Sequence, residues 1–148
     1  MSGAVQLVCP SCSAINRIPA EKVAHHPLCG KCRAPLILSN PIECSDDSLQ
    51  RHIQHSGMPV LVDFWAPWCG PCVGFAPVYA EVAESAQTQL RFLKLDTQAH
   101  PQSGAAFGIR SIPTLILFHQ GKEVTRLSGA LPKLQFQQWL VEQLQALN

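Results

Sequence analysis

Three Cys-x-x-Cys pairs are the residues of this sequence best suited to chemistry. They account for six of its seven cysteines and are Cys9–Cys12, Cys29–Cys32 and Cys69–Cys72. Two thiols at this spacing can share a metal ion or form a disulfide with each other. The sequence around each pair, and the spacing between pairs, has to decide which chemistry it carries.

The first two pairs have the spacing of a zinc site. Sixteen residues separate Cys12 from Cys29, which gives the pattern C-x2-C-x16-C-x2-C. Each short pair turns two thiolates toward one point, and two such points complete a tetrahedron around Zn²⁺. We therefore predict one zinc ion, bound by Cys9, Cys12, Cys29 and Cys32. The alternatives are two disulfides or four unliganded thiols, and the adjacent His25 and His26 are weaker candidate ligands.

The segment that carries these two pairs cannot build a core alone. No aromatic residue precedes Phe64, so the metal has to stabilise residues 1–38, which we call the four-cysteine module. Four basic residues and one acidic residue give the module a charge of +3, which a zinc tetrathiolate lowers to +1. Without a basic surface or a stacking aromatic, a nucleic-acid partner is not expected. Residues 39–41 form a linker, and residues 42–148 a larger domain.

The composition indicates a folded protein without a strong electrostatic field. The chain has 148 residues, of which 47% are hydrophobic and 14% charged, and its formal net charge is +1. This charge attracts neither nucleic acid nor anionic lipid. No apolar stretch is long enough to cross a bilayer and no secretory signal is recognisable, so we expect a cytoplasmic protein with no membrane partner.

The third pair differs because it is expected to follow a buried strand and to open a helix. Free backbone N–H groups at the start of that helix would favour the Cys69 thiolate, and Cys72 lies one turn later on the same face. A third metal site would need a partner pair, but only Cys44 remains. A purely structural disulfide is unusual in the cytosol. The pair is therefore interpreted as a redox dithiol.

Helix and strand patterns alternate through the larger domain. We predict a capped helix ending near Gly57, a buried strand, a helix from Cys69 to about Gln87 that is kinked at Pro77, a second strand, a hairpin that turns at Gly121, and an amphipathic C-terminal helix. This order implies an α/β sandwich with a mixed sheet.

From Ile42 to Leu147 the sequence resembles the thioredoxin family. The matching stretches are "VDFWAPWCGPC", the helix residue Pro77, "LKLD", "GIRSIPT" and the "GA" at residues 129–130. The four-cysteine module resembles the zinc-binding extension of some bacterial members. The resemblance implies a thioredoxin fold, a central mixed sheet flanked by helices, preceded by a small zinc-ribbon-like module. Pro67 departs from many members and should alter only the surface, and Cys44 is interpreted as a passive thiol.

The resemblance also implies catalytic roles. Cys69 would attack a substrate disulfide and Cys72 would resolve the mixed disulfide. Asp63, in an otherwise apolar strand, would be buried with a raised pKa and exchange a proton with Cys72, unless it lies at a solvated edge. Lys94 would be the partner of that carboxylate, although it could instead face outward.

The same resemblance implies a client-binding surface around the dithiol. Pro113 matches a proline that is cis in the family, next to backbone that pairs with the client chain. The expected substrate-binding residues are Trp68, Gly70, Pro71, Ile112, Pro113 and Gly129.

Together these features predict a protein-disulfide reductase. It would use the Cys69–Cys72 disulfide as its redox group, bind no organic cofactor, act on disulfide-containing clients as a monomer, and be re-reduced by NADPH-dependent thioredoxin reductase. The alternatives are a thiol oxidase or isomerase of the same fold and a zinc-dependent redox-sensing chaperone. The Gly-Pro between the cysteines favours the reductase.

Overall fold

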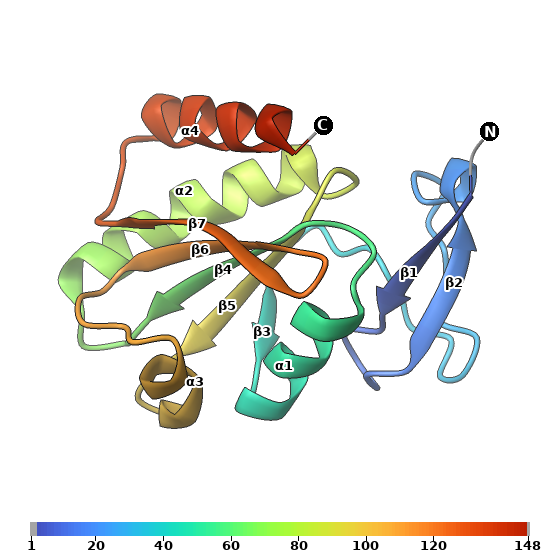
Figure 1. Ribbon diagram of the computed structural model, residues 1–148, viewed down its shortest axis with the longest axis horizontal. Coiled ribbons are helices and arrows are strands. Elements are labelled where there is room, and N and C mark those ends of the chain that lie inside the picture. Colours follow the sequence, from blue (N-terminus) through green and yellow to red (C-terminus); the bar gives the residue numbers. More distant parts are fainter. Residues whose placement is uncertain (1–2, 148) are drawn as a thin grey trace.

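The computed structural model describes residues 3–147 and contains two separate β-sheets (Figure 1). The smaller sheet belongs to the four-cysteine module and pairs β1 (Ala4–Val8) with β2 (Ile15–Pro19) in antiparallel fashion. A single 3₁₀ turn, η1 (Ala20–Lys22), follows β2. The Cys9–Cys12 pair lies in the connection between the two strands, which Cys9 closes by donating its backbone N–H to the Ala14 carbonyl at 2.9 Å.

The larger sheet has five strands in the order β3-β5-β4-β6-β7. The first three in this order are parallel, and β6 and β7 are added antiparallel. The strands are β3 (Ile42–Cys44), β4 (Val60–Trp65), β5 (Arg91–Asp96), β6 (Thr114–His119) and β7 (Lys122–Ser128). The mixed sheet confirms the predicted fold class, although β1, β2 and β3 were not identified from the sequence.

Helices cover both faces of the larger sheet (Figure 1). On one face lie α2 (Gly70–Ala86) and α4 (Lys133–Ala146), and on the other lie α1 (Asp46–His55) and α3 (Pro101–Ala106). Within residues 3–147, no helix combines the length and apolar character that a membrane span requires.

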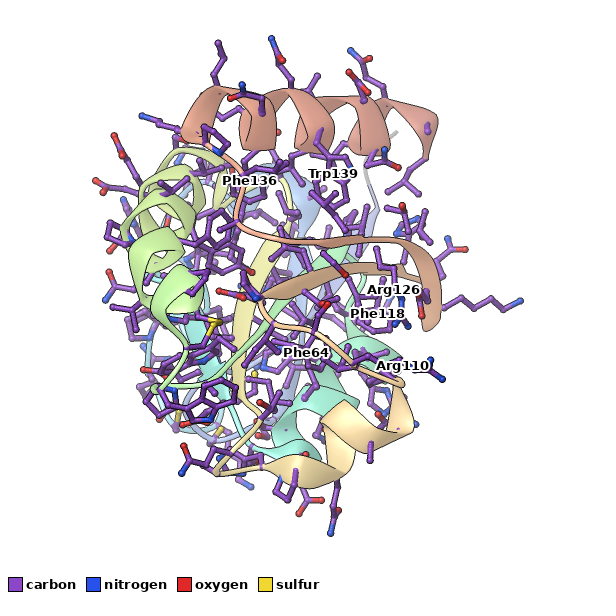
Figure 2. The ribbon with its side chains drawn as sticks, turned by 90° about the vertical axis from the view of Figure 1, so that its left-hand side faces the viewer. Phe64, Arg110, Phe118, Arg126, Phe136 and Trp139 are labelled. Carbon is purple, nitrogen blue, oxygen red and sulfur yellow. A yellow bond between two sulfur atoms is a disulfide. The ribbon has the colours of Figure 1, made fainter. Side chains whose placement is uncertain are left out.

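The central strand β4 alternates between the two hydrophobic cores. Leu61 packs among the side chains of α2 and α4, whereas Val62 and Phe64 pack on the face covered by α1, as expected because successive residues of a strand point to opposite faces. Figure 2 shows Phe136 and Trp139 between α4 and the sheet. The amphipathic C-terminal helix is thus confirmed.

Two glycines were expected to mark a turn or the end of a helix, and the structure confirms one of them. Gly121 has a φ of +80° between β6 and β7, which confirms the predicted hairpin turn. Gly57 was expected to end the first helix, but α1 ends at His55 with Ser56 as its C-terminal cap. The Gly57 N–H instead donates to the Gln6 carbonyl at 2.7 Å, and a Cβ at this position would meet the Gln6 backbone nitrogen at 3.0 Å.

The four-cysteine module therefore packs directly on the larger domain. Leu7 and Leu36 of the module share a buried cluster with Met58, which precedes β4. At the rim of this contact, the Arg51 guanidinium donates to the Ser13 carbonyl at 2.6 Å.

Candidate active site and metal site

Cys69 and Cys72 form a disulfide at the start of α2, with their Cα atoms 5.3 Å apart. Cys69 is the N-cap residue of this helix, and its sulfur accepts the Cys72 backbone N–H at 3.2 Å. Both side chains are nearly inaccessible, at 4% and 1% exposure. The helix start thus directs a backbone donor at the Cys69 sulfur, an arrangement that favours its thiolate when the pair is reduced.

Asp63 is a fully buried carboxyl on β4, the strand that leads into the motif. It lies two residues after Leu61 and therefore on the sheet face that packs against α2. Neither carboxyl oxygen has a hydrogen-bond partner among residues 3–147. Burial raises the pKa of Asp63 to about 7, and the positive charge of Lys94 partly opposes this effect. The carboxyl can therefore hold or release a proton near neutral pH.

Lys94 is paired in register with Asp63 across β4 and β5. Its ammonium lies 4.4 Å from the centroid of the Trp65 ring, an arrangement typical of a cation–π contact. No ion pair joins Lys94 to Asp63 in the described part of the chain. The positive charge of Lys94 therefore influences the Asp63 carboxyl electrostatically, while the ammonium group contacts the Trp65 ring.

An open groove of about 300 Å³ lies beside the disulfide, with Trp68 and Ile112 in its lining. The Trp68 side chain is 72% exposed, and the Cys69 sulfur lies 3.7 Å from the Ile112 carbonyl oxygen. Arg110, also in the lining, brings a positive charge to this surface; Figure 2 shows it at the edge of the molecule. It was not among the predicted site residues, although it belongs to the "GIRSIPT" stretch.

The remaining predicted contact residues lie in the first turn of α2 and in the loops that precede β6 and follow β7. Gly70 and Pro71 form the exposed first turn of α2. The Ile112–Pro113 peptide bond is cis, as expected. Gly129 has a φ of +105° and donates its N–H to the Pro113 carbonyl at 2.9 Å. This bond fixes the loop that holds Ile112 beside Cys69.

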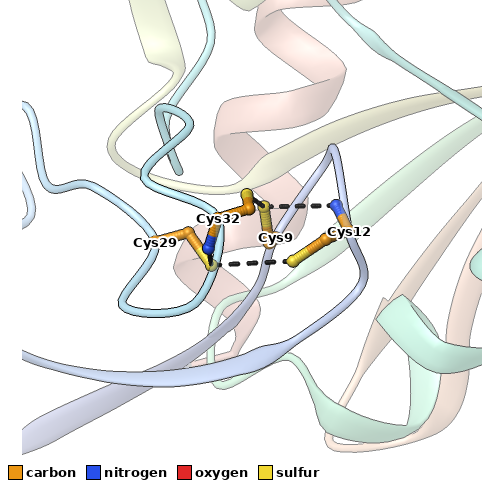
Figure 3. Close-up of side chains that lie close together, drawn as sticks. All are labelled: Cys9, Cys12, Cys29 and Cys32. Carbon is orange, nitrogen blue, oxygen red and sulfur yellow. Dashed lines mark hydrogen bonds between the residues drawn. The ribbon is translucent and has the colours of Figure 1, made fainter.

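The four cysteines of the module converge on one point (Figure 3). Their sulfur atoms all lie within 4.8 Å of one another, with Cys9 and Cys32 3.6 Å apart and Cys12 and Cys29 3.7 Å apart. Four sulfurs bound tetrahedrally to Zn²⁺ at about 2.3 Å lie about 3.8 Å apart. The donor set and its spacing thus fit a structural zinc ion.

Backbone amides of each turn also point at a sulfur. The N–H groups of Ser11 and Cys12 lie 3.3 and 3.4 Å from the Cys9 sulfur. Those of Lys31 and Cys32 lie 3.3 and 3.5 Å from the Cys29 sulfur. Such donors stabilise thiolates, the form that a metal requires. Among the described residues, the metal-ligand cluster consists of the four cysteines alone and excludes His25 and His26.

Comparison with known proteins agrees with this geometry. The sequence profile described as Thioredoxin matches residues 40–142. The chain belongs to the thioredoxin family. Its module matches a zinc-ribbon profile described as Thioredoxin 2, N-terminal, over residues 8–34.

Curated thioredoxins align over most of the chain. Thioredoxin C-3 of Corynebacterium nephridii is 50% identical over 139 residues, covering 94% of this chain and 95% of the relative. Thioredoxin 1 of a Nostoc species is 41% identical over 107 residues, which are 72% of this chain and 100% of that relative. Membership of this family makes the chain a thiol–disulfide oxidoreductase.

The seventh cysteine takes no part in either site of this thioredoxin. Cys44 ends β3, is 5% exposed, and lies within the hydrophobic core next to α1. Burial raises the pKa of its thiol to about 12, so the thiolate is not populated at neutral pH. This agrees with a passive thiol.

Proposed function

We propose that this thioredoxin is a protein-disulfide reductase whose working group is the Cys69–Cys72 dithiol. The Cys69 thiolate attacks one sulfur of a client disulfide, forms a mixed disulfide and releases the first client thiolate. The Cys72 thiolate then attacks the Cys69 sulfur, releases the second client thiolate and leaves the Cys69–Cys72 disulfide. Two electrons pass to the client, and NADPH-dependent thioredoxin reductase returns them to the dithiol.

The observation that carries the proposal is the placement of the disulfide at the start of α2, beside an open groove. The backbone N–H that Cys69 accepts lowers the free energy of its thiolate. The Cys69 sulfur also lies 3.7 Å from the carbonyl oxygen of Ile112, a residue that lines the groove, whereas Cys72 is 1% exposed within α2. This difference supports the order of attack.

Asp63 is proposed as the group that takes the proton of Cys72. The carboxyl faces the helix that carries Cys72, and its pKa of about 7 lets it accept a proton at neutral pH. Lys94 tunes this pKa through its charge. The buried carboxyl has no competing hydrogen bond among the described residues.

Client chains are proposed to bind across the groove and the loop before β6. An extended client segment would pair with exposed backbone there and place its disulfide at Cys69. The proposed contacts are Trp68, Gly70, Pro71, Ile112, Pro113 and Gly129.

One zinc ion is proposed at Cys9, Cys12, Cys29 and Cys32. When bound, it would supply a structural link between the two turns of a module that has little core of its own. We propose the division into module (1–38), linker (39–41) and thioredoxin domain (42–148). We also propose a cytoplasmic location, because a reducing compartment keeps metal-binding thiolates from forming disulfides.

The test is insulin reduction coupled to thioredoxin reductase and NADPH, followed as NADPH oxidation and insulin precipitation. The wild-type chain should turn over many times, and a Cys69→Ser variant should not. No NADPH consumption, together with reactivation of scrambled ribonuclease, would instead favour an oxidase or isomerase. Suppression of client aggregation that persists in Cys69→Ser, without turnover, would favour a chaperone.

A further inference from the structure

Arg91 is a buried cation at the contact between the module and the thioredoxin domain. It is the first residue of β5 and is 2% exposed. Its guanidinium leaves the sheet and enters the module, where Nη1 donates to the Leu36 carbonyl at 2.7 Å and Nη2 donates to the Val8 carbonyl at 3.0 Å. A single side chain of the larger domain thus satisfies two buried carbonyls of the smaller one.

One of these carbonyls directly precedes the first cysteine pair, and the other lies shortly after the second pair. Val8 directly precedes Cys9, while Leu36 follows the second pair and donates its N–H to the Pro27 carbonyl at 3.0 Å. The intervening turn is closed by the Cys29 N–H, which donates to the Ala34 carbonyl at 2.8 Å. The planar guanidinium therefore fixes the separation of the two segments that deliver the four sulfurs.

Arg91 is a buried cation without an acidic partner in the part of the chain that the structure describes. The structure shows no ion pair of Arg91 with an acidic side chain among residues 3–147. Burial lowers its pKa to about 10, so it remains charged at neutral pH, and the side chains that interact with its charge include Cys44, Cys9 and His52. Cys44 is a neutral thiol at this pH.

The nearby His52 is also uncharged. It is 1% exposed on α1, and burial, with a smaller effect of the Arg91 charge, lowers its pKa to about 3. The imidazole is therefore neutral. A buried cation without a counter-charge is strongly unfavourable. Zn²⁺ held by four thiolates would carry a net charge of −2, and its proposed ligand Cys9 directly follows Val8, whose carbonyl Arg91 binds.

We propose that Arg91 is a positioning residue of the metal site, which holds the two cysteine pairs at the separation the metal needs and compensates the negative charge of the metal tetrathiolate. This inference rests on the zinc site proposed above. Because coupling between two sites is reciprocal, loss of Arg91 weakens zinc binding, and loss of zinc weakens the packing of the module on the thioredoxin domain.

The test compares zinc affinity and stability among full-length variants. Arg91→Met removes the charge and both donors with little change in length, and Arg91→Lys retains the charge but cannot reach both carbonyls. The matched control is Arg51→Met, because Arg51 also donates to a module carbonyl but is exposed. Zinc is titrated against the chelator 4-(2-pyridylazo)resorcinol, and thermal unfolding is recorded with and without zinc.

Arg91→Met should lower zinc affinity by about tenfold or more, with Arg91→Lys between it and the wild type and Arg51→Met close to the wild type. The rise in melting temperature on adding zinc should be smaller in Arg91→Met than in the wild type. These readouts do not depend on reductase activity.

Different outcomes separate the inference from the metal site on which it rests. A wild-type protein that binds no zinc would overturn both. Wild-type affinity in Arg91→Met, in a chain that does bind zinc, would overturn only the role of Arg91. Should Arg91→Met not fold, Arg91→Lys decides the question: reduced affinity supports the role and unchanged affinity overturns it.

Discussion

Asp63 and Lys94 occupy paired positions on neighbouring parallel strands, yet no ion pair joins them in the described part of the chain. The lysine ammonium lies over the Trp65 ring instead. The carboxyl is left fully buried without a hydrogen bond among the described residues. Burial therefore dominates its protonation, and this relationship leads to two predictions.

Asp63→Asn should stabilise the protein at alkaline pH. The folded state raises the pKa of Asp63 from 3.8 to about 7, so it binds the proton more tightly than the unfolded chain, and stability falls as pH rises between these values. Above pH 7, ionisation of the buried carboxyl lowers the free energy of unfolding by about 4 kcal/mol. Urea unfolding at pH 5 and 8.5 should show a larger advantage of the variant at 8.5, whereas exposed Glu84→Gln should show none. A pH-independent advantage would contradict the buried, titrating carboxyl.

Lys94→Met should raise the pKa of Asp63 further. The positive charge of Lys94 opposes the effect of burial, so its removal leaves the carboxylate less favoured. The Asp63 carboxyl carbon can be titrated by ¹³C NMR in both proteins. Lys122→Met, at the exposed start of β7, is the control that leaves the titration unchanged. An identical midpoint in Lys94→Met would show that the lysine does not act on the carboxyl.

Cys72→Ser should trap clients as mixed disulfides, because Cys69 still attacks but no second thiolate displaces the client. Cys69→Ser should trap none, and both variants should lose multiple turnover. Non-reducing electrophoresis with insulin as the client measures the trapped species. Continued turnover in Cys72→Ser would reverse the proposed roles.

Gly57→Ala should destabilise the protein by about 1–3 kcal/mol because the new Cβ collides with the Gln6 backbone. Gly74 is the matched control, since it lies inside α2, and beyond its chain neighbours and the adjacent helix backbone no atom lies within 4 Å of the position its Cβ would take. Gly74→Ala should stabilise by about 0.5–1 kcal/mol through helix propensity. Urea midpoints of both variants test this, and equal effects would argue against the close approach of the module.

Removal of residues 1–38 should leave an active but less stable reductase. The sequence motifs of the dithiol lie outside this segment, but its loss exposes Met58 and removes both acceptors of Arg91. Exposure of the Met58 side chain alone should lower the free energy of unfolding by about 2 kcal/mol. Urea unfolding of the shortened chain measures the difference, and an unchanged midpoint would show that the module contributes nothing to the stability of the domain.

Features that depend on local spacing could be predicted from the amino-acid sequence. Two short cysteine pairs predicted the metal-ligand cluster, because each pair shapes its own turn. The alternation of strand and helix patterns predicted the mixed sheet, and Gly121 marked the hairpin because its backbone needs a positive φ. Asp63 could be identified as buried from the apolar residues on either side of it.

Contacts between segments far apart in the chain became apparent only in the folded protein. Lys94 contacts Trp65, an interaction set by the register between two strands. Gly57, which seemed a helix terminator, accommodates a module strand about fifty residues away. Arg91, which no sequence motif singled out, is buried between the two parts. No local sequence pattern predicts these contacts, because packing between distant segments determines which side chains lose their access to water.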